Sequence, residues 1–357
     1  MQINYHSLAK AVTMWSQLKE IAAQGLPFVC FRMPNSNLVK VYQQKDTALN
    51  ILKDFDKEGF VFAPFDTTEL PTIFLTKDAT LSFEYKIEEP KRSNTTTDFL
   101  ESDKTSYLNR IKKAVTAIKG GGYQKIVLSR SIQAQLNKDA TTHYKSCLDS
   151  YTNAFCYLFY HPRVGTWLGA TPERLCKLKG NTIKTASLAG TWVAENSSLP
   201  NWGQKELEEQ QMVTDYIIAA LKPFSKSVSV SKVQSVKAGN LWHLKTNIEG
   251  QLLTSQSLLQ VVQDLHPTPA VCGIPKMDAK KYILQNEGYS RTYYTGYLGP
   301  VNSLHGETEI FVNLRCMQLS ATDATIYVGG GITKDSIPEN EWEETQAKSK
   351  TMGALLS

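Results

Sequence analysis

The sequence predicts an α+β fold built around large, mainly antiparallel β-sheets. Short runs rich in β-branched and aromatic residues recur along the whole chain, separated by glycine, proline and small polar residues. Helical spacing of apolar residues is confined to a few long segments that lie far apart. Many strands with a few scattered helices are typical of α+β domains. No repeat of roughly 20–50 residues is visible, which argues against a solenoid.

The N-terminal part is predicted to begin with a helix and to continue as short strands. Four runs carry the strand pattern: Pro27–Arg32, Leu38–Tyr42, Phe60–Phe65 and Thr72–Leu75. The polar segment Glu88–Thr105 holds Pro90 and three consecutive threonines. We expect an exposed loop or a subdomain boundary there.

Two long helices are predicted in the rest of the chain. The first covers Ser106–Lys119 and ends at Gly120-Gly121-Gly122, and the second covers Gly203–Lys222. The apolar stripe of the first helix consists of Tyr107, Ile111, Ala114, Val115 and Ile118. The predicted strands are Lys125–Arg130, Phe155–Tyr160, Thr166–Ala170, Leu175–Lys179, Thr182–Ser187, Val228–Val233, His243–Gly250, Gly296–Val301, Glu309–Gln318 and Ala324–Gly329.

The composition is that of an ordinary globular protein. Of 357 residues, 41% are hydrophobic and 20% charged, and the formal net charge is +5. Without a basic run, nucleic-acid binding is not expected. No apolar stretch reaches the roughly 20 residues that span a bilayer, and the N-terminus carries no signal pattern. The six cysteines lack metal-site spacing, which favours reduced thiols and a cytoplasmic location.

The C-terminal region carries the strongest functional signal. Gly329, Gly330 and Gly331 have no Cβ, so the backbone of this predicted turn can approach a ligand closely. A helix beginning near Pro338 would place Glu341, Glu344 and Lys348 on one face. Two carboxylates and a cation beside bare glycines suit a metal ion and an anionic small molecule.

The predicted helix 203–222 continues its apolar stripe with two carboxylates. Glu206 and Glu209 precede Val213 and Ile217 at helical spacing. Inward-facing carboxylates are costly unless they are paired or bind a metal, and hard oxygen ligands suit Mg²⁺. The alternative is a solvated first turn, where the helix dipole also favours glutamate.

Four further residues are candidates for chemistry. Glu173 follows Pro172 between two predicted strands. It is either a general acid whose pKa is raised by burial or part of a plain turn. Lys125 begins an apolar strand, where it is either a desolvated base or a charged side chain that reaches solvent. His266 lies in a rigid loop with two prolines, where it either binds a ligand or has a structural role. Arg315 lies in an apolar run and would pair with a substrate carboxylate.

Taken together and in this order, five motifs resemble the chorismate-utilising enzyme family. They are Lys125-Ile-Val-Leu-Ser-Arg130, Gly169-Ala-Thr-Pro-Glu-Arg-Leu175, Ala189-Gly-Thr191, Leu265-His-Pro-Thr-Pro-Ala-Val-Cys-Gly273, and Gly329-Gly-Gly-Ile with Pro338-Glu-x-Glu-x-x-Glu and Lys348. The resemblance implies one α+β domain with two large antiparallel sheets stacked face to face and helices outside, the fold of anthranilate synthase component I. Residues 1–95 would be a variable part of this fold and residues 96–357 the chorismate-binding core.

Three positions indicate which branch of the family the chain resembles. Members that add ammonia usually have glutamine at the place of Lys125, whereas the water-adding branch has lysine. Aminodeoxychorismate synthases carry a nucleophilic lysine that Ser187-Leu-Ala-Gly-Thr191 lacks, and salicylate synthases tend to have threonine at the place of Ala270. We therefore expect an isochorismate synthase without an amidotransferase subunit. The alternatives are a salicylate synthase, an amino-adding component, and a degenerate member that only binds or regulates.

The resemblance also assigns roles. Lys125 would activate water and Glu173 would protonate the leaving hydroxyl. Glu209 and Glu344 would bind Mg²⁺ directly, with Glu206 and Glu341 acting through water. The residues that would bind chorismate are Ala189, Gly190, Thr191, His243, Ala270, Tyr294, Arg315, Gly330, Gly331 and Lys348. One departure is Gln210, because many members have histidine there. The product would serve menaquinone or siderophore synthesis, and we expect menaquinone as the broader use.

Overall fold

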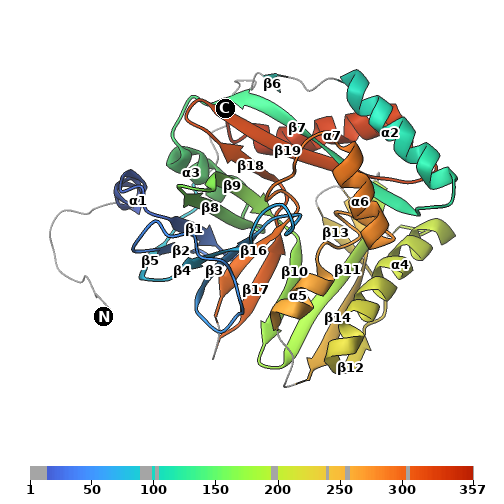
Figure 1. The fold of residues 1–357 in the computed structure, drawn as a ribbon, viewed down its shortest axis with the longest axis horizontal. Helices are drawn as coiled ribbons and strands as arrows, with labels where there is room; N and C mark the ends of the chain where they lie inside the picture. The colour runs from blue at the N-terminus through green and yellow to red at the C-terminus, as the bar shows by residue number, and fades with distance from the viewer. Residues whose placement is uncertain are drawn as a thin grey trace.

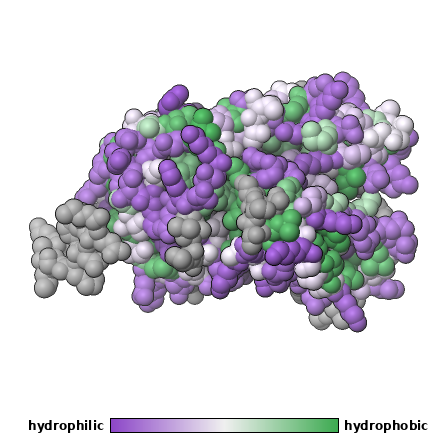
Figure 2. Space-filling view, turned by 60° about the horizontal axis from the view of Figure 1, so that its bottom comes forward, coloured by the Kyte–Doolittle hydropathy of each residue, from purple (hydrophilic) through white to green (hydrophobic). Residues whose placement is uncertain are grey.

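The computed structural model describes residues 14–88, 99–100, 104–193, 200–238, 241–253, 258–302 and 306–356. Within these residues the strands form two sheets, of ten and nine strands, in which every pairing is antiparallel. The predicted α+β class with two large antiparallel sheets is confirmed (Figure 1). On the face shown in Figure 2, hydrophilic residues cover most of the surface and hydrophobic ones gather in smaller patches.

The ten-stranded sheet combines the start, middle and end of the chain. Its strands are β1 (Phe28–Arg32), β2 (Leu38–Gln43), β5 (Ala79–Glu84), β6 (Phe99–Leu100), β7 (Lys125–Gln135), β8 (Phe155–His161), β9 (Gly165–Thr171), β15 (Gly273–Ile274), β18 (Cys316–Leu319) and β19 (Asp323–Ile332). Their order across the sheet is β15, β7, β19, β18, β9, β8, β1, β2, β5, and β6 also pairs with β7.

The nine-stranded sheet is built in the same interleaved way. Its strands are β3 (Gly59–Ala63), β4 (Ile73–Thr76), β10 (Arg174–Lys179), β11 (Thr182–Val193), β12 (Ser225–Val230), β13 (Gln234–Ala238), β14 (Leu241–Leu252), β16 (Tyr297–Val301) and β17 (Thr308–Val312). Their order is β12, β14, β11, β10, β17, β16, β3, β4, and β13 also pairs with β14.

The helices cover the outer faces of the sheets. They are α1 (Met14–Ala23), α2 (Lys104–Lys119), α3 (Ala140–Ser150), α4 (Gln204–Leu221), α5 (Leu258–Leu265), α6 (Lys276–Asn286) and α7 (Pro338–Gly353), with a short 3₁₀ turn at Lys222–Phe224. Helix α4 packs along β11 and β14, whereas α2 and α7 lie against each other beside β19 (Figure 1). No helix in the described ranges has the length and apolar character needed to cross a membrane.

The two sheets face each other across a core of aromatic side chains. Phe31 and Phe155 come from the ten-stranded sheet, and Phe60 and Phe311 come from the nine-stranded sheet. The rings of Phe155 and Phe311 stack with their centroids 4.4 Å apart. Large rings bury much apolar surface, so this layer holds the sheets together.

The N-terminal strands take part in both sheets. Strand β1 pairs with β8 in one sheet, and β3 pairs with β16 in the other. The division at residue 95 stays a prediction. Of the predicted loop Glu88–Thr105, residues 89–98 and 101–103 lie outside the described residues, whereas Phe99–Leu100 pairs with β7 and helix α2 begins at Lys104.

Two sequence predictions near the C-terminus were wrong. The run Glu309–Gln318 is two strands in different sheets, because Arg315 adopts a left-handed backbone with φ of 48° between β17 and β18. The glycines 329–331 form part of β19 rather than a turn, because their backbone is fully paired to β7. The stripe of α2 was predicted correctly, since Tyr107, Ile111, Ala114 and Ile118 are buried.

Candidate functional site

The pairing of β7 with β19 brings Lys125 over the glycine run. Gly331 lies opposite Val127, and a Cβ built on Gly331 would be 2.6 Å from Cε of Lys125 and 3.3 Å from its Nζ. The aliphatic part of Lys125 therefore lies on the bare backbone of Gly331. A side chain at residue 331 would occupy the same space.

Helix α4 supplies a carboxylate to Lys125. Nζ of Lys125 lies 3.3 Å from Oε1 of Glu209, and both side chains are partly exposed. The next residue, Gln210, is buried and anchors the helix to the sheet. Its amide donates to the hydroxyl of Ser187 on β11 at 2.8 Å and to that of Thr246 on β14 at 3.0 Å. These bonds fix the turn of α4 that carries Glu209.

Helix α7 presents two carboxylates and a lysine to the same glycines. A Cβ built on Gly330 would be 3.2 Å from Oε2 of Glu341 and 3.7 Å from Oε1 of Glu344. Nζ of Lys348 donates to the carbonyl of Gly329 at 2.9 Å and lies 2.5 Å from Oε1 of Glu344. The predicted convergence of these three side chains beside the glycines is present in the structure.

A buried arginine holds α7 in this position. Arg130, on β7, donates from Nε to Thr345 at 2.8 Å and from Nη2 to Gln346 at 2.7 Å. Its guanidinium lies 4.0 Å from the ring centre of Trp342. Strand β7 therefore carries Lys125 at its start and anchors the acidic helix through Arg130.

The electrostatics of the acidic helix favour a cation. Burial raises the pKa of the Glu341 carboxyl, and the charge of Glu344 raises it further, while Ser336, Lys348 and Lys125 act in the opposite direction. Two carboxylates that repel each other are stabilised when a cation lies between them.

Glu173 lies in the turn between β9 and β10, as predicted. Its backbone is fixed on both sides: its N–H donates to the hydroxyl of Thr171 at 3.3 Å, and its carbonyl accepts from the N–H of Val312 at 2.9 Å. Burial raises the pKa of the Glu173 carboxyl to about 7, and Lys125 opposes this rise. Glu173 can therefore hold or release a proton near neutral pH.

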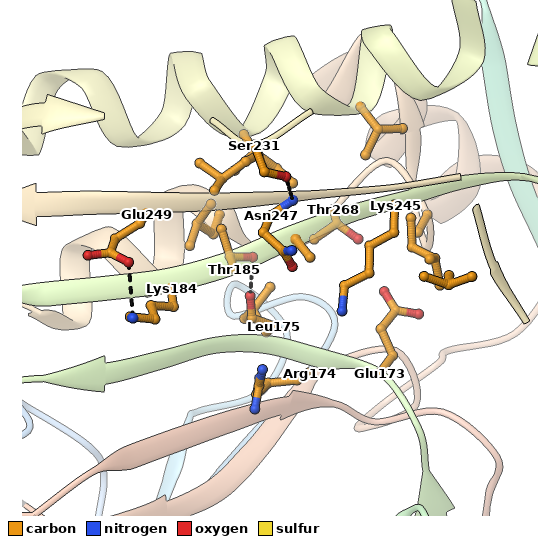
Figure 3. A pocket seen from close by; sticks show the side chains of 18 of the residues that line it. Glu173, Arg174, Leu175, Lys184, Thr185, Ser231, Lys245, Asn247, Glu249 and Thr268 are labelled. Carbon is orange, nitrogen blue, oxygen red and sulfur yellow. Dashed lines mark hydrogen bonds and ion pairs between the residues drawn. The ribbon is translucent and has the colours of Figure 1, made fainter. Parts of the chain in front are cut away.

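A cavity of about 810 Å³ begins beside Glu173. It opens where β10 and β11 separate, because these strands pair only between 177–179 and 182–184. Its lining includes Glu173, Arg174, Lys184, Lys245, Thr268 and Ala270. Figure 3 shows part of this lining, with Glu173 at the edge of the opening.

The Ala189-Gly190-Thr191 segment forms a bulge in β11. The pairing register with β14 shifts there, and Gly190 has a φ of 67°, which favours glycine. Nδ1 of His243 lies 3.0 Å from the carbonyl oxygen of Gly190. A Cβ built on Gly190 would be 3.4 Å from Cβ of Glu206, so α4 begins directly over this bulge.

Tyr294 contacts the glycine run, and Arg315 contacts helix α7. Tyr294 stacks on Tyr327 at 5.2 Å between ring centres, and a Cβ built on Gly329 would be 3.2 Å from its hydroxyl. Burial raises the pKa of Tyr294, which keeps it a neutral hydroxyl. Arg315 donates to the hydroxyl of Thr351 at 3.0 Å. Arg315 thus lies at a junction between sheets rather than within a strand.

Of the two predicted roles of His266, ligand binding and structural support, the structure favours structural support. It is buried, and its Nε2 lies 2.8 Å from the carbonyl oxygen of Thr295. Burial lowers the pKa of the imidazole to about 4. The neutral ring braces the loop that carries Ala270.

A buried ion pair behind Lys125 was missed by the sequence prediction. Arg291 binds Glu287 at 2.6 Å and also donates to the carbonyl groups of Val127 and Val271 at 2.8 and 2.9 Å. Glu287 in turn accepts from the hydroxyl of Ser129 at 2.6 Å. The four-residue spacing of Glu287 and Arg291 was the available signal.

The predicted Mg²⁺ ligands come from two helices, α4 and α7. Glu341 and Glu344 meet at Gly330, whereas Glu209 binds Lys125 and Glu206 lies at Gly190. Among the described side chains, no group of three or more His, Cys, Asp or Glu is placed to hold a metal ion. Mg²⁺ characteristically takes only one or two protein carboxylates together with water and substrate oxygens. The oxygen-only donors and the mutual repulsion of Glu341 and Glu344 fit such an ion.

Comparisons with known proteins agree with the resemblance. Residues 31–357 match the chorismate binding enzyme family. Isochorismate synthase DhbC of Bacillus subtilis strain 168 is 30% identical over 312 residues, which cover 81% of this chain and 78% of the relative. Isochorismate synthase MenF of Escherichia coli strain K12 is 30% identical over 265 residues, covering 71% of this chain. The aligned part spans only 61% of the length of that relative.

A solved structure shares the fold. The menaquinone-specific isochorismate synthase MenF from Escherichia coli superposes with a TM-score of 0.80 at 21% sequence identity. The match covers 98% of this chain and 92% of the other. Since nearly all of the chain is covered, the N-terminal strands belong to the shared architecture.

Proposed function

The chain belongs to the chorismate binding enzyme family, and we infer from this that it is an isochorismate synthase, an isomerase that converts chorismate to isochorismate. The observation that carries the proposal is the placement of Lys125 and Glu173. One is a lysine lying on bare backbone, and the other is a carboxyl whose pKa is raised to about 7. A base and an acid are the two groups that the reaction requires.

The reaction moves a hydroxyl group from C4 to C2 of the ring. Water attacks C2, and we propose that neutral Lys125 accepts a proton from this water. The double bonds shift around the ring as the C4 hydroxyl departs, and protonated Glu173 donates its proton so that water leaves. One water enters and one departs, so the molecular formula does not change.

The resting ion pair constrains this assignment. Lys125 is ion-paired with Glu209 in the structure, and an ammonium cannot accept a proton, so the amine must be neutral when it acts as the base. Glu173 must begin protonated, and the desolvation that raises its pKa favours that form. Lys125 also opposes the rise in the pKa of Glu173, so the charges of the two side chains interact.

The remaining residues would bind and orient the substrate. We propose that Arg315, Tyr294, Lys348 and the amides of Gly330 and Gly331 bind carboxylates, and that His243 and Ala270 line the ring pocket. The side chain of Thr191, predicted to do the same, lies outside what the structure describes. Ala189 and Gly190 would let the backbone approach the ligand.

Mg²⁺ is the proposed cofactor. Glu209 and Glu344, with Glu206 and Glu341 behind them, are the residues that would hold it. When bound, Mg²⁺ would supply positive charge to the ring carboxylate of chorismate. We further propose that the product serves menaquinone synthesis, as the name of the Escherichia coli enzyme states for that protein.

The test is incubation of the purified protein with chorismate, with and without Mg²⁺, followed by chromatography and mass detection. We expect an Mg²⁺-dependent isomer of unchanged mass and no pyruvate. Salicylate with pyruvate would overturn the branch assignment and identify a salicylate synthase. A product formed only with ammonia would identify the amino-adding branch. Unchanged chorismate in every condition would refute the proposed activity.

A further inference from the structure

One edge of strand β7, which begins at Lys125, has only short partner strands. Strand β15 pairs with this edge at Lys125 and Ile126, and β6 pairs with it near the other end of the strand. Between these two pairings, no strand of the described residues lies beside this edge. Val127 and Ser129 lie in this gap and are buried, so their backbone N–H and C=O groups need partners.

The side chains of Glu287 and Arg291 take the place of the missing strand. Nη2 of Arg291 donates to the carbonyl of Val127 at 2.8 Å, and Oε1 of Glu287 accepts from the N–H of Ser129 at 2.5 Å. The hydroxyl of Ser129 donates to the same carboxylate oxygen at 2.6 Å. The edge of β7 is therefore bonded to an ion pair at two successive outward-facing residues.

Arg291 also reaches two other elements that carry proposed substrate-binding residues. Its Nη1 donates to the carbonyl of Val271 at 2.9 Å, in the loop that contains Ala270. The same nitrogen donates to the hydroxyl of Thr295 at 3.2 Å, and the N–H of Tyr294 donates to the carbonyl of Arg291 at 2.8 Å. One residue thus holds together strand β7, the loop with Ala270 and the turn with Tyr294.

This set of bonds requires an arginine. Nε and Nη2 of Arg291 donate to Glu287 at 2.6 and 2.7 Å, so all five N–H groups of the guanidinium are used. The planar group lies 4.5 Å from the centre of the Phe65 ring. A lysine has three donors on one nitrogen, so it can keep the charge pair but not all of these bonds.

Stability alone does not account for a buried ion pair at this place. Glu287 and Arg291 are 1% and 3% exposed. Taking both charges out of water costs free energy, and well-packed apolar residues of similar volume are often as stabilising or more so. Apolar residues, however, could not bond to the backbone of β7 or fix its position relative to the loop and the turn.

We propose that the Glu287–Arg291 pair positions the proposed base, because it sets β7, and with it Lys125, relative to the loop and the turn that would contact the substrate. This inference rests on the proposed function. Glu287 and Arg291 are positioning residues, since they act through these three elements. Their loss should therefore reduce turnover in addition to stability.

The test compares Arg291→Lys with Arg32→Lys. Arg32 is a matched control, because it is also buried and donates to two backbone carbonyls, those of Leu148 and Tyr151, at 2.8 and 2.7 Å. Its strand, β1, is separated from β7 by four strands of the same sheet, β19, β18, β9 and β8. The rate of isochorismate formation is measured at a temperature at which circular dichroism shows both variants to be folded.

Arg291→Lys should lower kcat about tenfold or more, because a small misplacement of a catalytic group is costly. The KM for chorismate should change less than about threefold, since Arg315 and Lys348 lie outside this network. Arg32→Lys should lower the melting temperature as well, but its kcat should stay within about twofold of the wild type. A purely structural role would leave kcat and KM of the folded enzyme unchanged in both variants.

Ser129→Ala provides a second measurement if Arg291→Lys does not fold. It removes the hydroxyl that donates to Glu287 and leaves every charge in place, and kcat should fall about threefold or more. A kcat within about twofold of the wild type in the folded variant would overturn the positioning role and leave the proposed function intact. Equal losses of kcat in Arg291→Lys and Arg32→Lys would also overturn it. A wild-type chain that does not convert chorismate would overturn both.

Discussion

Nζ of Lys125 and Oε1 of Glu209 lie 3.3 Å apart, although the residues are 84 positions apart in the sequence. The contact joins the first residue of β7 to a helix packed on the other sheet. It therefore ties the proposed base to the proposed metal-binding helix. The position of each charge depends on the other, and both depend on how the two sheets stack.

Lys125→Gln should reduce kcat by about 10²-fold or more, because an amide cannot accept a proton from water. Glutamine keeps most of the side-chain length over Gly331, so the fold should be preserved. The measurement is the rate of isochorismate formation at saturating chorismate and Mg²⁺. Lys184→Gln is the control and should retain normal turnover. A near-normal rate in Lys125→Gln would rule out Lys125 as the base.

The pKa of Glu173 predicts a pH-dependent rate. A general acid must be protonated, so kcat should fall as the pH rises through about 7. Glu173→Gln should lower kcat by about 10²-fold or more at every pH and remove this descending limb. The check is a profile of kcat from pH 5 to pH 9 in both proteins. A limb that persists in Glu173→Gln would show that another group is responsible.

The same shift predicts an effect on stability. The folded-state pKa is raised from 4.5 to about 7, so the folded protein binds the proton more tightly than the unfolded chain does. Stability linked to this group is fully present below pH 4.5 and is lost as the pH rises to about 7. The melting temperature of Glu173→Gln, measured relative to that of the wild type, should therefore be higher at pH 8 than at pH 5. Equal differences at the two pH values would contradict a raised pKa.

Gly331→Ala should separate activity from stability. The new Cβ would meet Cε of Lys125 at 2.6 Å, and the flexible end of that side chain can move away. The fold should survive, but the displaced amine should lower kcat by about tenfold to a hundredfold. Gly122→Ala is the control, since nothing lies within 4 Å of its Cβ position. Unchanged turnover in Gly331→Ala would mean that Lys125 works from another position.

Glu344→Gln should weaken Mg²⁺ binding. Removal of one carboxylate should raise the Mg²⁺ concentration for half-maximal activity by about tenfold or more. Titration calorimetry with Mg²⁺ gives the same comparison without turnover. The neighbouring exposed residue Glu343 is not a proposed ligand, so Glu343→Gln should resemble the wild type. Identical Mg²⁺ affinities in Glu344→Gln and Glu343→Gln would refute the assignment.

Glu287→Gln should destabilise the protein strongly. Glu287 and Arg291 are 1% and 3% exposed, so the substitution would leave a buried guanidinium without its counter-charge. The expected loss in free energy of unfolding is about 3–5 kcal/mol, measured by urea denaturation. Glu249→Gln breaks the exposed pair with Lys184 and should cost less than about 1 kcal/mol.

Residues that are neighbours in sequence were the easiest to place in advance. The stripe of α2, the face of α7 and the turn at Glu173 each depend on local spacing, which a sequence displays directly. Helices α3, α5 and α6 were missed. Helix α6 has weak apolar periodicity, and α3 and α6 pack against β8 and β7. Tertiary contacts decide such segments, and a single sequence does not show them.

The contacts that assemble the site could not be derived from spacing alone. The proximity of Lys125 to Glu209 requires the stacking of two sheets. The break between β17 and β18 depends on the positive φ of Arg315, which the residue type arginine does not predict. The cavity beside Glu173 opens where β10 and β11 separate, which local spacing does not show.

The packing of α7 on α2 has a consequence for the timing of protein synthesis. More than 200 residues separate Lys119 from Pro338, so α2 is synthesised long before the helix that packs on it, and part of its apolar stripe lacks a partner in the meantime. During that interval the chain can form most of both sheets but lacks Glu341, Glu344 and Lys348. The acidic side of the proposed site is therefore completed late in synthesis, and until then the part of the stripe that α7 covers is a surface that a chaperone can recognise.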